Sequence, residues 1–527
     1  MERWGRFILI LASLLAFSPA IVSSFHFDDY SLFTGAAVTS SSGWWEVFRL
    51  EKTRPLTYLT FWLNYQIGGE NPLGYHLVNL GLHLAAVWLA WGIFRRLADD
   101  TGGALAAIVF ALHPLQTEAV AYVFARATLL AALFCLLCWR DWIDRRFGRS
   151  VVWFALAMLA KEEAAAFPLF LMGAEWLAGR RELSISAPWL KAGAAMLGIT
   201  GLFAARLAYA GSVTPGAGIG VQLGDITPTT YLLTQGRVIL KYLTLIVWPA
   251  GLNFDRDVAL STGLDPSAIA AWAALIAVCI ASVWLARRRP EAYWLLGGLL
   301  LLIPTSSVVP LADLMGERRM YLPLLSFSLP IGLLLARIPK WAPLGVAALL
   351  AVLTFQRTGV WRTEESLWRD TVEKSPVKVR PKLQLARALG NNTPPDRAEQ
   401  LQLLEQALQL APDDPVVAEQ RGAFFLQTGS PQAALEEFDR AISLHGRNAQ
   451  SLANRGVALH VLGRTREATA SFREALDLDA CNFDALHNLL LTSGRARLPS
   501  GATPPELVRE GCRFSPEQLR QLRAIGR

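Results

Sequence analysis

The sequence predicts an all-α protein in which a polytopic membrane helix bundle is followed by an α-solenoid. Apolar residues make up 53% of the 527 positions and come in blocks long enough to cross lipid. Much of the Lys and Arg falls in short clusters between these blocks, which is the distribution that membrane topology imposes. The C-terminal third instead consists of shorter amphipathic segments that repeat every 34 residues, as stacked helical repeats do.

The first apolar block is interpreted as an uncleaved transmembrane helix. It runs from a basic start at Arg3 and Arg6 to about Val22, and many more apolar blocks follow it. The predicted total is about eleven spans, with boundaries good to about three residues. The later spans lie at 73–94, 103–115, 127–143, 150–160, 164–178, 188–209, 268–286, 292–310, 321–336 and 342–357.

A further apolar stretch, 231–249, is expected to lie in the outer interface or to re-enter it. Arg237 and Lys241 lie within it, and counting it as a span would place the basic run Arg287–Arg289 outside. With the N-terminus in the cytoplasm and this stretch not counted, every cytoplasmic connection is basic. These connections are Arg95–Arg96, Arg140–Arg149, Arg180–Arg181, Arg287–Arg289 and Arg337–Lys340.

The alternation of apolar spans and basic connections also predicts the domain organisation. It predicts a transmembrane domain over 1–357, whose first loop, 24–55, faces outward, and a connecting segment over 358–380. Repeats over 381–495 and a capping helix with a tail over 496–527 then lie on the outer side, which is periplasmic or lumenal. The lipid bilayer is therefore an expected partner of the chain.

The repeats resemble tetratricopeptide repeats. Small residues recur in register at Gly422 and Gly456, and large aromatic ones at Phe438 and Phe472. Small residues allow paired helices to approach closely, and the aromatic rings fill the space between them. Such arrays form a concave groove suited to extended peptide, so an acceptor polypeptide is an expected partner.

Composition and cysteine spacing exclude other classes. The formal net charge is +7, but no basic stripe with interleaved aromatics is present, so nucleic acid is not an expected partner. Cys135 and Cys138 form a C-x-x-C inside an apolar helix without βαβ context, which indicates small buried residues and not a redox motif. Cys481 and Cys512 could pair if the repeats are exported.

Two adjacent carboxylates, Asp28 and Asp29, are the first candidates for chemistry. They follow the first span directly, between Phe27 and Tyr30, where partial burial raises a carboxyl pKa towards useful base strength. A single loop aspartate is usually only solvated. This pair, however, shares its predicted side with several polar groups that are expensive to keep near lipid unless they face a cavity.

The other outward-facing charges fall into three groups. Glu118 and Arg126 follow the break at His113-Pro114, where a capped amphipathic helix and a site role are both open. Lys161 lies beside Glu162 between two short spans. Two roles are open for it: a salt bridge to a neighbouring carboxylate, or a contact with an anionic substrate.

The third group is Arg318 and Arg319, which violate the positive-inside preference. A compensating anion such as a lipid phosphate would explain them, and plain interfacial snorkelling is the alternative. Further candidates that would shape a site are Arg54, His76, His113 and Tyr321. No convincing cluster of metal ligands is visible. If a divalent cation such as Mg or Mn is used as a cofactor, Asp28 and Glu118 are its expected ligands.

These motifs together resemble a known family. The resemblance is carried by Phe27-Asp28-Asp29, Arg54-Pro55-Leu56, Gly74-Tyr75-His76-Leu77-Val78-Asn79 with Leu82-His83, His113-Pro114 with Glu118-Ala119-Val120 and Arg126, Lys161-Glu162-Glu163 and Arg318-Arg319-Met320-Tyr321-Leu322-Pro323, followed by the repeats. With these motifs the chain is similar to the transmembrane-and-tetratricopeptide-repeat protein O-mannosyltransferases, which are relatives of the GT-C glycosyltransferases. The resemblance covers essentially the whole chain. The Gly-rich loop between Gly211 and Gly224 matches no donor contact.

The resemblance implies a GT-C-like bundle and an inverting sugar transfer. GT-C enzymes take a sugar from a polyprenyl-phosphate carrier and use an acidic residue of the first outer loop, which by position is Asp28 or Asp29. Mannose or a similar sugar would pass to a hydroxyl acceptor, with Ser or Thr of an exported protein as the natural nucleophile. Arg318 or Arg319, with Lys161 and Arg126, would bind the donor phosphate. The alternative is a non-catalytic membrane scaffold whose repeats recruit partners, and scattered site residues would favour it.

Overall fold

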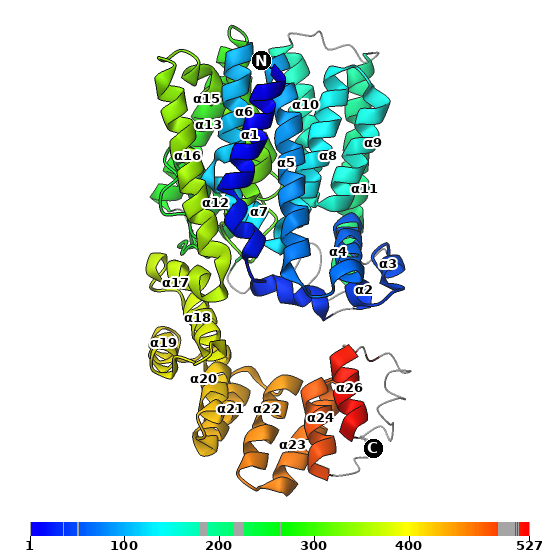
Figure 1. The fold of residues 1–527 in the computed structure, drawn as a ribbon, viewed down its shortest axis with the longest axis vertical. Helices are drawn as coiled ribbons and strands as arrows, with labels where there is room; N and C mark the ends of the chain where they lie inside the picture. The colour runs from blue at the N-terminus through cyan, green and yellow to red at the C-terminus, as the bar shows by residue number, and fades with distance from the viewer. Residues whose placement is uncertain are drawn as a thin grey trace. The chain divides into compact units, whose positions relative to one another are not determined.

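The chain folds into two helical units. The computed structural model describes residues 2–34, 36–49, 52–179, 187–213, 226–263, 265–493, 512, 514 and 516–525, and these residues contain no strand. The first unit comprises Met1–Leu32 and Ala37–Leu367, and the second comprises Phe33–Ala36 and Trp368–Arg527. Helix α17 (Glu364–Lys374) runs across the boundary between them (Figure 1).

The first unit is a helical bundle, and several of its helices begin at a proline or at an aspartate cap. Proline suits a first helical position because the N–H it lacks has no partner in a helix. Asp99 caps α6 by accepting hydrogen bonds from Thr101 N and Gly102 N. The helices are α1 (Glu2–Ala16), α2 (Ala36–Thr39), α3 (Gly43–Glu46), α4 (Pro55–Gly68), α5 (Pro72–Leu97), α6 (Asp100–Leu112), α7 (Thr117–Ala121), α8 (Arg126–Ile143), α9 (Phe147–Ala160), α10 (Phe167–Gly173), α11 (Pro188–Val213), α12 (Pro228–Val247), α13 (Pro266–Ala286), α14 (Tyr293–Leu302), α15 (Tyr321–Leu335) and α16 (Trp341–Gly359).

Several of these helices have the length and composition of membrane spans. Among the described residues five do so alone, and α6 with the bent segment Pro114–Ala121 would make a sixth. Three shorter apolar helices cover Trp4–Ala16, Phe147–Ala160 and Pro290–Leu302. Helices therefore occupy the predicted positions, while the total of about eleven spans stays a prediction.

Two predicted spans are interrupted. The first ends as an α-helix at Ala16 and continues as a 3-10 turn over Ser18–Val22, because Pro19 cannot continue the hydrogen-bond ladder. The span predicted over 292–310 is wrong in its second half, since α14 ends at Leu302, just before Pro304. The stretch 231–249 does form a helix, α12, and whether it lies in the interface stays a prediction.

Helix α6 is held between α5 and α15 by backbone-to-backbone contact. A Cβ on Gly103 would lie 2.6 Å from Phe94 O on α5, and one on Gly332 of α15 would collide with the backbone of Gly102 and Ala106. Only glycine permits such close approach. This packing fixes α15 against α6, and therefore fixes the segments next to these helices, which carry Arg318 and Glu118.

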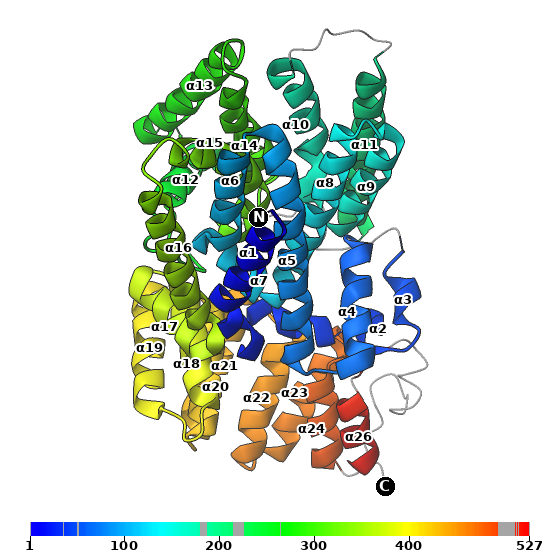
Figure 2. The same ribbon diagram turned by 45° about the horizontal axis from the view of Figure 1, so that its top comes forward.

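The predicted cytoplasmic connections meet at one end of the bundle, which Figure 2 shows from a second angle. Arg96, Arg145, Pro290 and Arg337 line one cavity, although they belong to four different connections or their edges. Arg180–Arg181, the fifth, lies outside the described residues. The alternation deduced from the charges is thus consistent with the packing, while the side of the membrane stays a prediction.

The second unit stacks helix hairpins. Its helices are α18 (Val379–Asn391), α19 (Arg397–Leu410), α20 (Pro415–Gln427), α21 (Pro431–His445), α22 (Ala449–Val461), α23 (Thr465–Leu478), α24 (Phe483–Ser493) and α26 (Pro516–Ile525). A Cβ on Gly422 would lie 2.6 Å from the Phe438 ring, and Gly456 has the same relation to Phe472. The sequence register is therefore explained by helix packing, as predicted.

A disulfide joins Cys481 and Cys512 at the end of the repeats. Cys512 and Leu522 belong to the apolar core that α22, α23 and α24 share. A helix, α26, lies within the segment predicted to cap the repeats, while 496–511 of that segment lie outside the described residues, as do 214–224 of the Gly-rich loop.

Candidate active site

The loop after the first span is anchored to the end of the last one. Ser24 N donates to Arg362 O at 3.1 Å, and His26 Nε2 lies 2.6 Å from Trp361 O. Phe25 packs edge-on against Tyr75, with ring centroids 5.3 Å apart. The loop that carries the two aspartates is therefore fixed on both sides.

The two aspartates have different environments. Asp29 is fully buried, and its two oxygens accept hydrogen bonds from His26 N at 2.9 Å and Phe124 N at 2.7 Å. Burial outweighs these donors and raises the pKa of Asp29 well above its usual value. Asp28 is partly exposed. Asp29 therefore stabilises the loop through its hydrogen bonds, and Asp28 is the more exposed of the two carboxylates.

Tyr122 connects Asp28 to the rest of the site. Its hydroxyl oxygen accepts from Asp28 N at 3.2 Å and also interacts with the Asp28 side chain. Its ring packs against Phe254 and Trp361, with centroids 5.5 Å and 5.9 Å apart. Packed aromatic rings from three separate segments therefore fix the position of Asp28.

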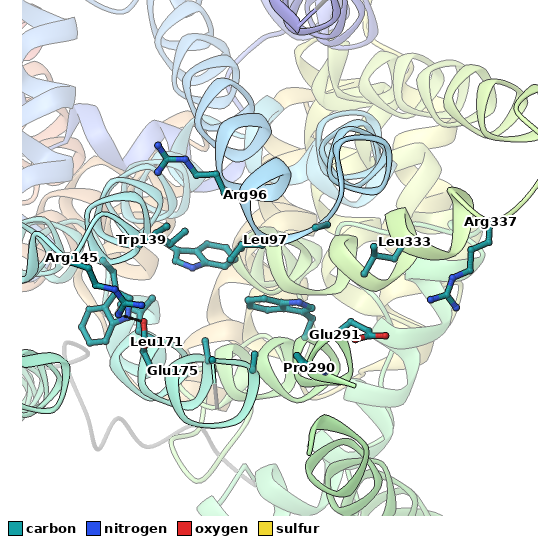
Figure 3. A pocket seen from close by; sticks show the side chains of 17 residues that line it. Arg96, Leu97, Trp139, Arg145, Leu171, Glu175, Pro290, Glu291, Leu333 and Arg337 are labelled. Carbon is teal, nitrogen blue, oxygen red and sulfur yellow. Dashed lines mark hydrogen bonds and ion pairs between the residues drawn. The ribbon is translucent and has the colours of Figure 1, made fainter. Parts of the chain in front are cut away.

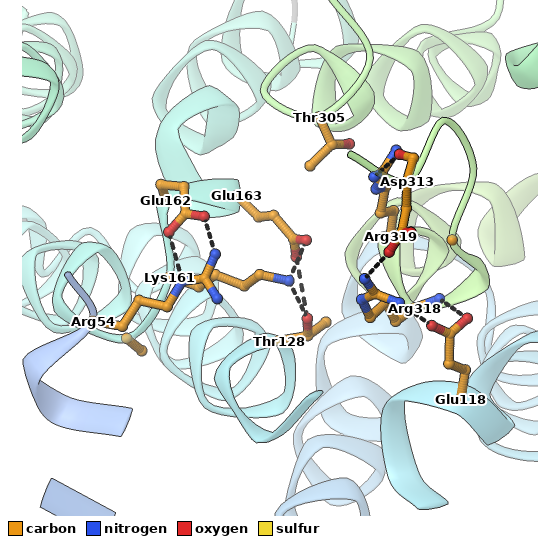
Figure 4. Close-up of polar contacts among 12 residues, drawn as sticks. Arg54, Glu118, Thr128, Lys161, Glu162, Glu163, Thr305, Asp313, Arg318 and Arg319 are labelled. Carbon is orange, nitrogen blue, oxygen red and sulfur yellow. Dashed lines mark hydrogen bonds and ion pairs between the residues drawn. The ribbon is translucent and has the colours of Figure 1, made fainter. Parts of the chain in front are cut away.

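Arg318 is held by two carboxylates. Its backbone N–H donates to Glu118 at 3.0 Å, its guanidinium pairs with the other Glu118 oxygen, and it also reaches Asp313 at 3.2 Å (Figure 4). Glu118 is fully buried, while the Arg318 side chain keeps 20% of its surface exposed. The bend of 48° between α6 and Pro114–Ala121 precedes Glu118 and belongs to the segment that meets Arg318.

Arg319 is bound by neutral acceptors. Its guanidinium donates to Asp313 O at 2.5 Å, to Leu314 O at 3.3 Å and to Tyr231 Oη at 3.3 Å. Only 6% of the residue is exposed. Three oxygen acceptors satisfy the hydrogen bonds of a cation but do not cancel its charge, so Arg319 contributes positive potential next to Arg318.

Lys161 and Arg54 form a second charged group on the other side of Figure 4. Lys161 pairs with Glu163 and donates to Thr128 Oγ1 at 2.7 Å. Burial lowers the pKa of Lys161 despite the carboxylate. Arg54 Nε donates to Glu162 at 3.0 Å, and the guanidinium overcomes the effect of burial and lowers the pKa of Glu162 to about 2. Each cation in this group therefore has a matching carboxylate.

The two charged groups converge with the aspartate loop. Three residues within 118–128 contact these groups. Glu118 pairs with Arg318, the Tyr122 hydroxyl oxygen accepts from Asp28 N at 3.2 Å, and Thr128 Oγ1 accepts from Lys161 at 2.7 Å. The structure therefore brings together Asp28, Glu118, Lys161 and Arg318, which come from four distant parts of the sequence.

Four predicted site residues are buried within the bundle. Arg126 is fully buried and donates to Asn79 Oδ1 at 2.8 Å and Tyr75 O at 3.0 Å. Backbone and amide oxygens already surround its guanidinium, and its contact with the donor phosphate stays a prediction. His113 Nε2 lies 2.9 Å from Ile246 O, and Tyr321 Oη donates to His83 Nδ1 at 2.8 Å.

His76, the fourth, is buried, and neither of its ring nitrogens has a hydrogen-bond partner among the described residues. Sequence reasoning, in turn, missed Tyr122 and Asp313. Tyr122 lies four residues after Glu118, on the same predicted outward segment, and Asp313 lies five before Arg318. Their position near a predicted charge was the available signal. Neither residue type points to chemistry by itself.

The described residues do not fit a divalent cation as they stand. No group of three or more His, Cys, Asp or Glu among them could hold a metal ion. Both oxygens of Glu118 accept hydrogen bonds from Arg318, so a cation there would have to displace an ion pair. Metal dependence stays a prediction, and no step below uses a cation.

Comparison with known proteins adds the family. Residues 52–204 match the model of the dolichyl-phosphate-mannose-protein mannosyltransferases. The protein O-mannosyl-transferase Tmtc1 of Drosophila melanogaster is 43% identical over 127 residues, which cover 23% of this chain and 15% of that protein. The protein O-mannosyl-transferase F38B6.6 of Caenorhabditis elegans is 26% identical over 420 residues, covering 73% and 60%.

Human TMTC4, also named a protein O-mannosyl-transferase, is 30% identical over 220 residues, covering 32% of this chain and 30% of that protein. The chain thus spans less than two thirds of the length of each of these relatives. These matches show that the chain is similar to the protein O-mannosyl-transferases, and with the helical structure they support its resemblance to the transmembrane-and-tetratricopeptide-repeat protein O-mannosyltransferase-like family.

Proposed function

We propose that the protein transfers mannose or a similar sugar from a polyprenyl-phosphate donor to a hydroxyl group, with Ser or Thr of an exported protein as acceptor, on the outer face of the membrane. The observation that carries this proposal is that residues 118–128 contact both the partly exposed Asp28 and the cations Lys161 and Arg318. A base and an anion-binding group within one site are what displacement of a phosphate by a hydroxyl group requires.

Asp28 is the proposed base. It accepts the proton of the acceptor hydroxyl while the hydroxyl oxygen attacks the anomeric carbon, and the bond from that carbon to the carrier phosphate breaks. Attack from the face opposite the leaving group inverts the configuration. Tyr122 holds Asp28 in place through its hydroxyl group. Asp29, whose oxygens are engaged by two backbone N–H groups, keeps the loop in shape.

Arg318, Arg319 and Lys161 are the proposed partners of the leaving phosphate. Arg318 is the one whose side chain is appreciably exposed, and Glu118 and Asp313 keep its guanidinium in one orientation. Preorganised cations stabilise developing negative charge without rearranging during the reaction. Arg319 and Lys161 add positive potential from buried positions.

The repeats are proposed to present the acceptor polypeptide on the outer side. The disulfide between Cys481 and Cys512 supports this location, because such bonds persist in oxidising compartments. A tetratricopeptide-type array offers a groove for extended chain. The outward orientation of both the repeats and the aspartate loop follows from the basic connections at the opposite end of the bundle.

Replacement of Asp28 by Asn tests this proposal. The purified full chain is incubated with polyprenyl-phosphate mannose and a Ser/Thr peptide, and consumption of the donor is measured. Asp28→Asn should reduce turnover by about 100-fold or more, the usual contribution of a general base. Asp257→Asn, the same change at an exposed aspartate of the same unit, should leave turnover unchanged. Wild-type turnover by Asp28→Asn would remove Asp28 from the mechanism.

The non-catalytic scaffold predicts a different outcome of the same assay. It predicts that a folded wild-type sample consumes none of a panel of polyprenyl-phosphate sugars, while the repeats still bind peptide. The contacts that gather Asp28, Glu118, Lys161 and Arg318 around residues 118–128 argue against it, since a scaffold gives no reason to gather these groups.

A further inference from the structure

A cavity of about 480 Å³ lies at the end of the bundle opposite the candidate active site. It is lined by the C-terminal ends of α5, α8 and α15, by the segment 174–179 after α10, and by the start of α14 (Figure 3). Helix α8 begins at Arg126, beside the candidate site, and reaches the cavity after 18 residues. At 1.5 Å per residue the two ends are about 27 Å apart, so the cavity is a separate site.

The wall of the cavity combines tryptophan with aliphatic side chains. Trp139, Trp142 and Trp294 are nearly fully buried, and each contributes to the lining. Leu97 and Leu333 line it from two of the helix ends, which lie at the level where apolar spans give way to basic connections. Tryptophan and aliphatic groups at that level are typical of contact with the lipid head-group region.

Two of the arginines at the cavity are neutralised by the protein itself. Arg96 pairs with Asp144 at 2.7 Å, and Arg145 pairs with Glu175 at 2.6 Å. Trp142 Nε1 also donates to Glu175, at 3.1 Å. These ion pairs lie at the edge of the cavity and leave little net charge there for a ligand.

Arg337 and Glu291 are different. Both line the cavity, and neither forms an ion pair with another side chain in the described part of the chain. In Figure 3 they come from two different segments on the side of the cavity away from Arg145. The cavity therefore presents one positive and one negative group beside an aromatic wall.

The backbone around the cavity is irregular, as it often is at functional sites. Residues Ala174–Ala178 form a π-helix, and four of the lining residues belong to it or follow it directly. Arg145 has φ of 61°, in the left-handed region that non-glycine residues rarely adopt. Both features cost stability, and both are over-represented where a ligand is bound.

We propose that this cavity binds the head group of a phospholipid that carries a phosphate and a primary ammonium group. The phosphate pairs with Arg337, which matches phosphate oxygens in charge and geometry. The ammonium group donates to Glu291 and lies against the tryptophan wall, whose ring faces attract cations. The first carbons of the acyl chains contact Leu97 and Leu333. This site does not depend on the proposed sugar transfer.

Lipid binding to the purified full chain, measured by native mass spectrometry, tests the proposal. Phosphatidylethanolamine should bind more tightly than phosphatidylglycerol, which has the phosphate but no ammonium group. Arg337→Gln should weaken both lipids by about tenfold or more, since a charged hydrogen bond is lost. Glu291→Gln should weaken phosphatidylethanolamine alone. Arg289→Gln, an exposed arginine near the same end that does not line the cavity, is the matched control and should change neither.

A second variant tests the cavity without changing its charge. Ala98 lines the cavity just after the end of α5, so Ala98→Trp should fill it and abolish binding while the melting temperature stays near that of the wild type. Equal binding of the two lipids, or equal effects of Arg337→Gln and Arg289→Gln, would overturn the proposal. Soluble phosphoethanolamine is added as a competitor of the lipid. Competition that depends on Arg337 and Glu291 in the same way would support the site and identify the free head group as a sufficient ligand.

Discussion

Glu317 precedes Arg318, the candidate phosphate-binding arginine. It is a buried carboxyl group, and its ionisation destabilises the folded state. Asn253 N donates to it at 2.5 Å and Arg357 lies 4.0 Å away, yet burial outweighs both and raises its pKa to about 7. A pKa raised in the folded state stabilises the protein below the unfolded pKa, and this stability is lost as the pH rises through the folded pKa.

The melting temperature should therefore fall as the pH rises from about 4.5 through 7. Glu317→Gln, which stays neutral at every pH, should remove this part of the pH dependence and melt higher than the wild type above pH 7. The measurement is a thermal melt of the full chain in detergent across pH 5 to 9. Parallel pH profiles for the two proteins would show that Glu317 is ionised throughout.

At the scale of elements, the approach of α15 to α6 decides where Arg318 lies. Gly332→Ala places a Cβ against the backbone of Gly102 and Ala106, which cannot yield as a side chain can. We expect a loss of about 1–3 kcal/mol in the free energy of unfolding, together with reduced donor consumption, because the segment before α15 is displaced.

Gly345→Ala is the matched control for that change. Gly345 is exposed on α16, and a Cβ there meets nothing within 4 Å. Its replacement should leave stability unchanged or raise it by up to about 1 kcal/mol, since alanine favours helix more than glycine does. Equal destabilisation by both substitutions would mean that the α6–α15 contact is not what Gly332 preserves.

The disulfide at the end of the repeats should hold α26 against the last hairpin. It closes a loop over a sequence separation of 31 residues, which the chain-entropy model values at about 4 kcal/mol. Cys481→Ser should therefore speed amide hydrogen exchange in α26 of the full chain. Exchange in α20, two hairpins away, is the internal control. Unchanged exchange in α26 would show that its apolar contacts are sufficient.

At the scale of the whole molecule, the charge distribution predicts which end faces the cytoplasm. Single cysteines placed at Ser42 and at Arg289, in a chain whose half-buried Cys279 is replaced by Ser, can be labelled in intact cells with an impermeant maleimide. Cys135 and Cys138 are buried and provide a low background. Ser42→Cys should react at once, and Arg289→Cys only after permeabilisation. The reverse pattern would invert the topology, and with it the proposed side of sugar transfer.

The sequence by itself determined the order of the segments along the chain. Apolar blocks, the basic connections between them and the 34-residue register of Gly422 and Gly456 follow from local composition and period, so they could be read without coordinates. The charged candidates on the outward side, including Asp28, Lys161 and Arg318, could also be chosen in this way. Charge is costly near lipid wherever the chain folds.

Only the tertiary structure decided which of these groups meet and what each one does. Arg318 pairs with Glu118 across a separation of 200 residues, and the buried Asp29 accepts a hydrogen bond from Phe124 N across 95 residues. Arg126, with the same charge as Arg318, is instead enclosed by neutral acceptors. Neighbouring residues point in different directions, and contacts between distant segments depend on helix packing, which a local pattern does not encode.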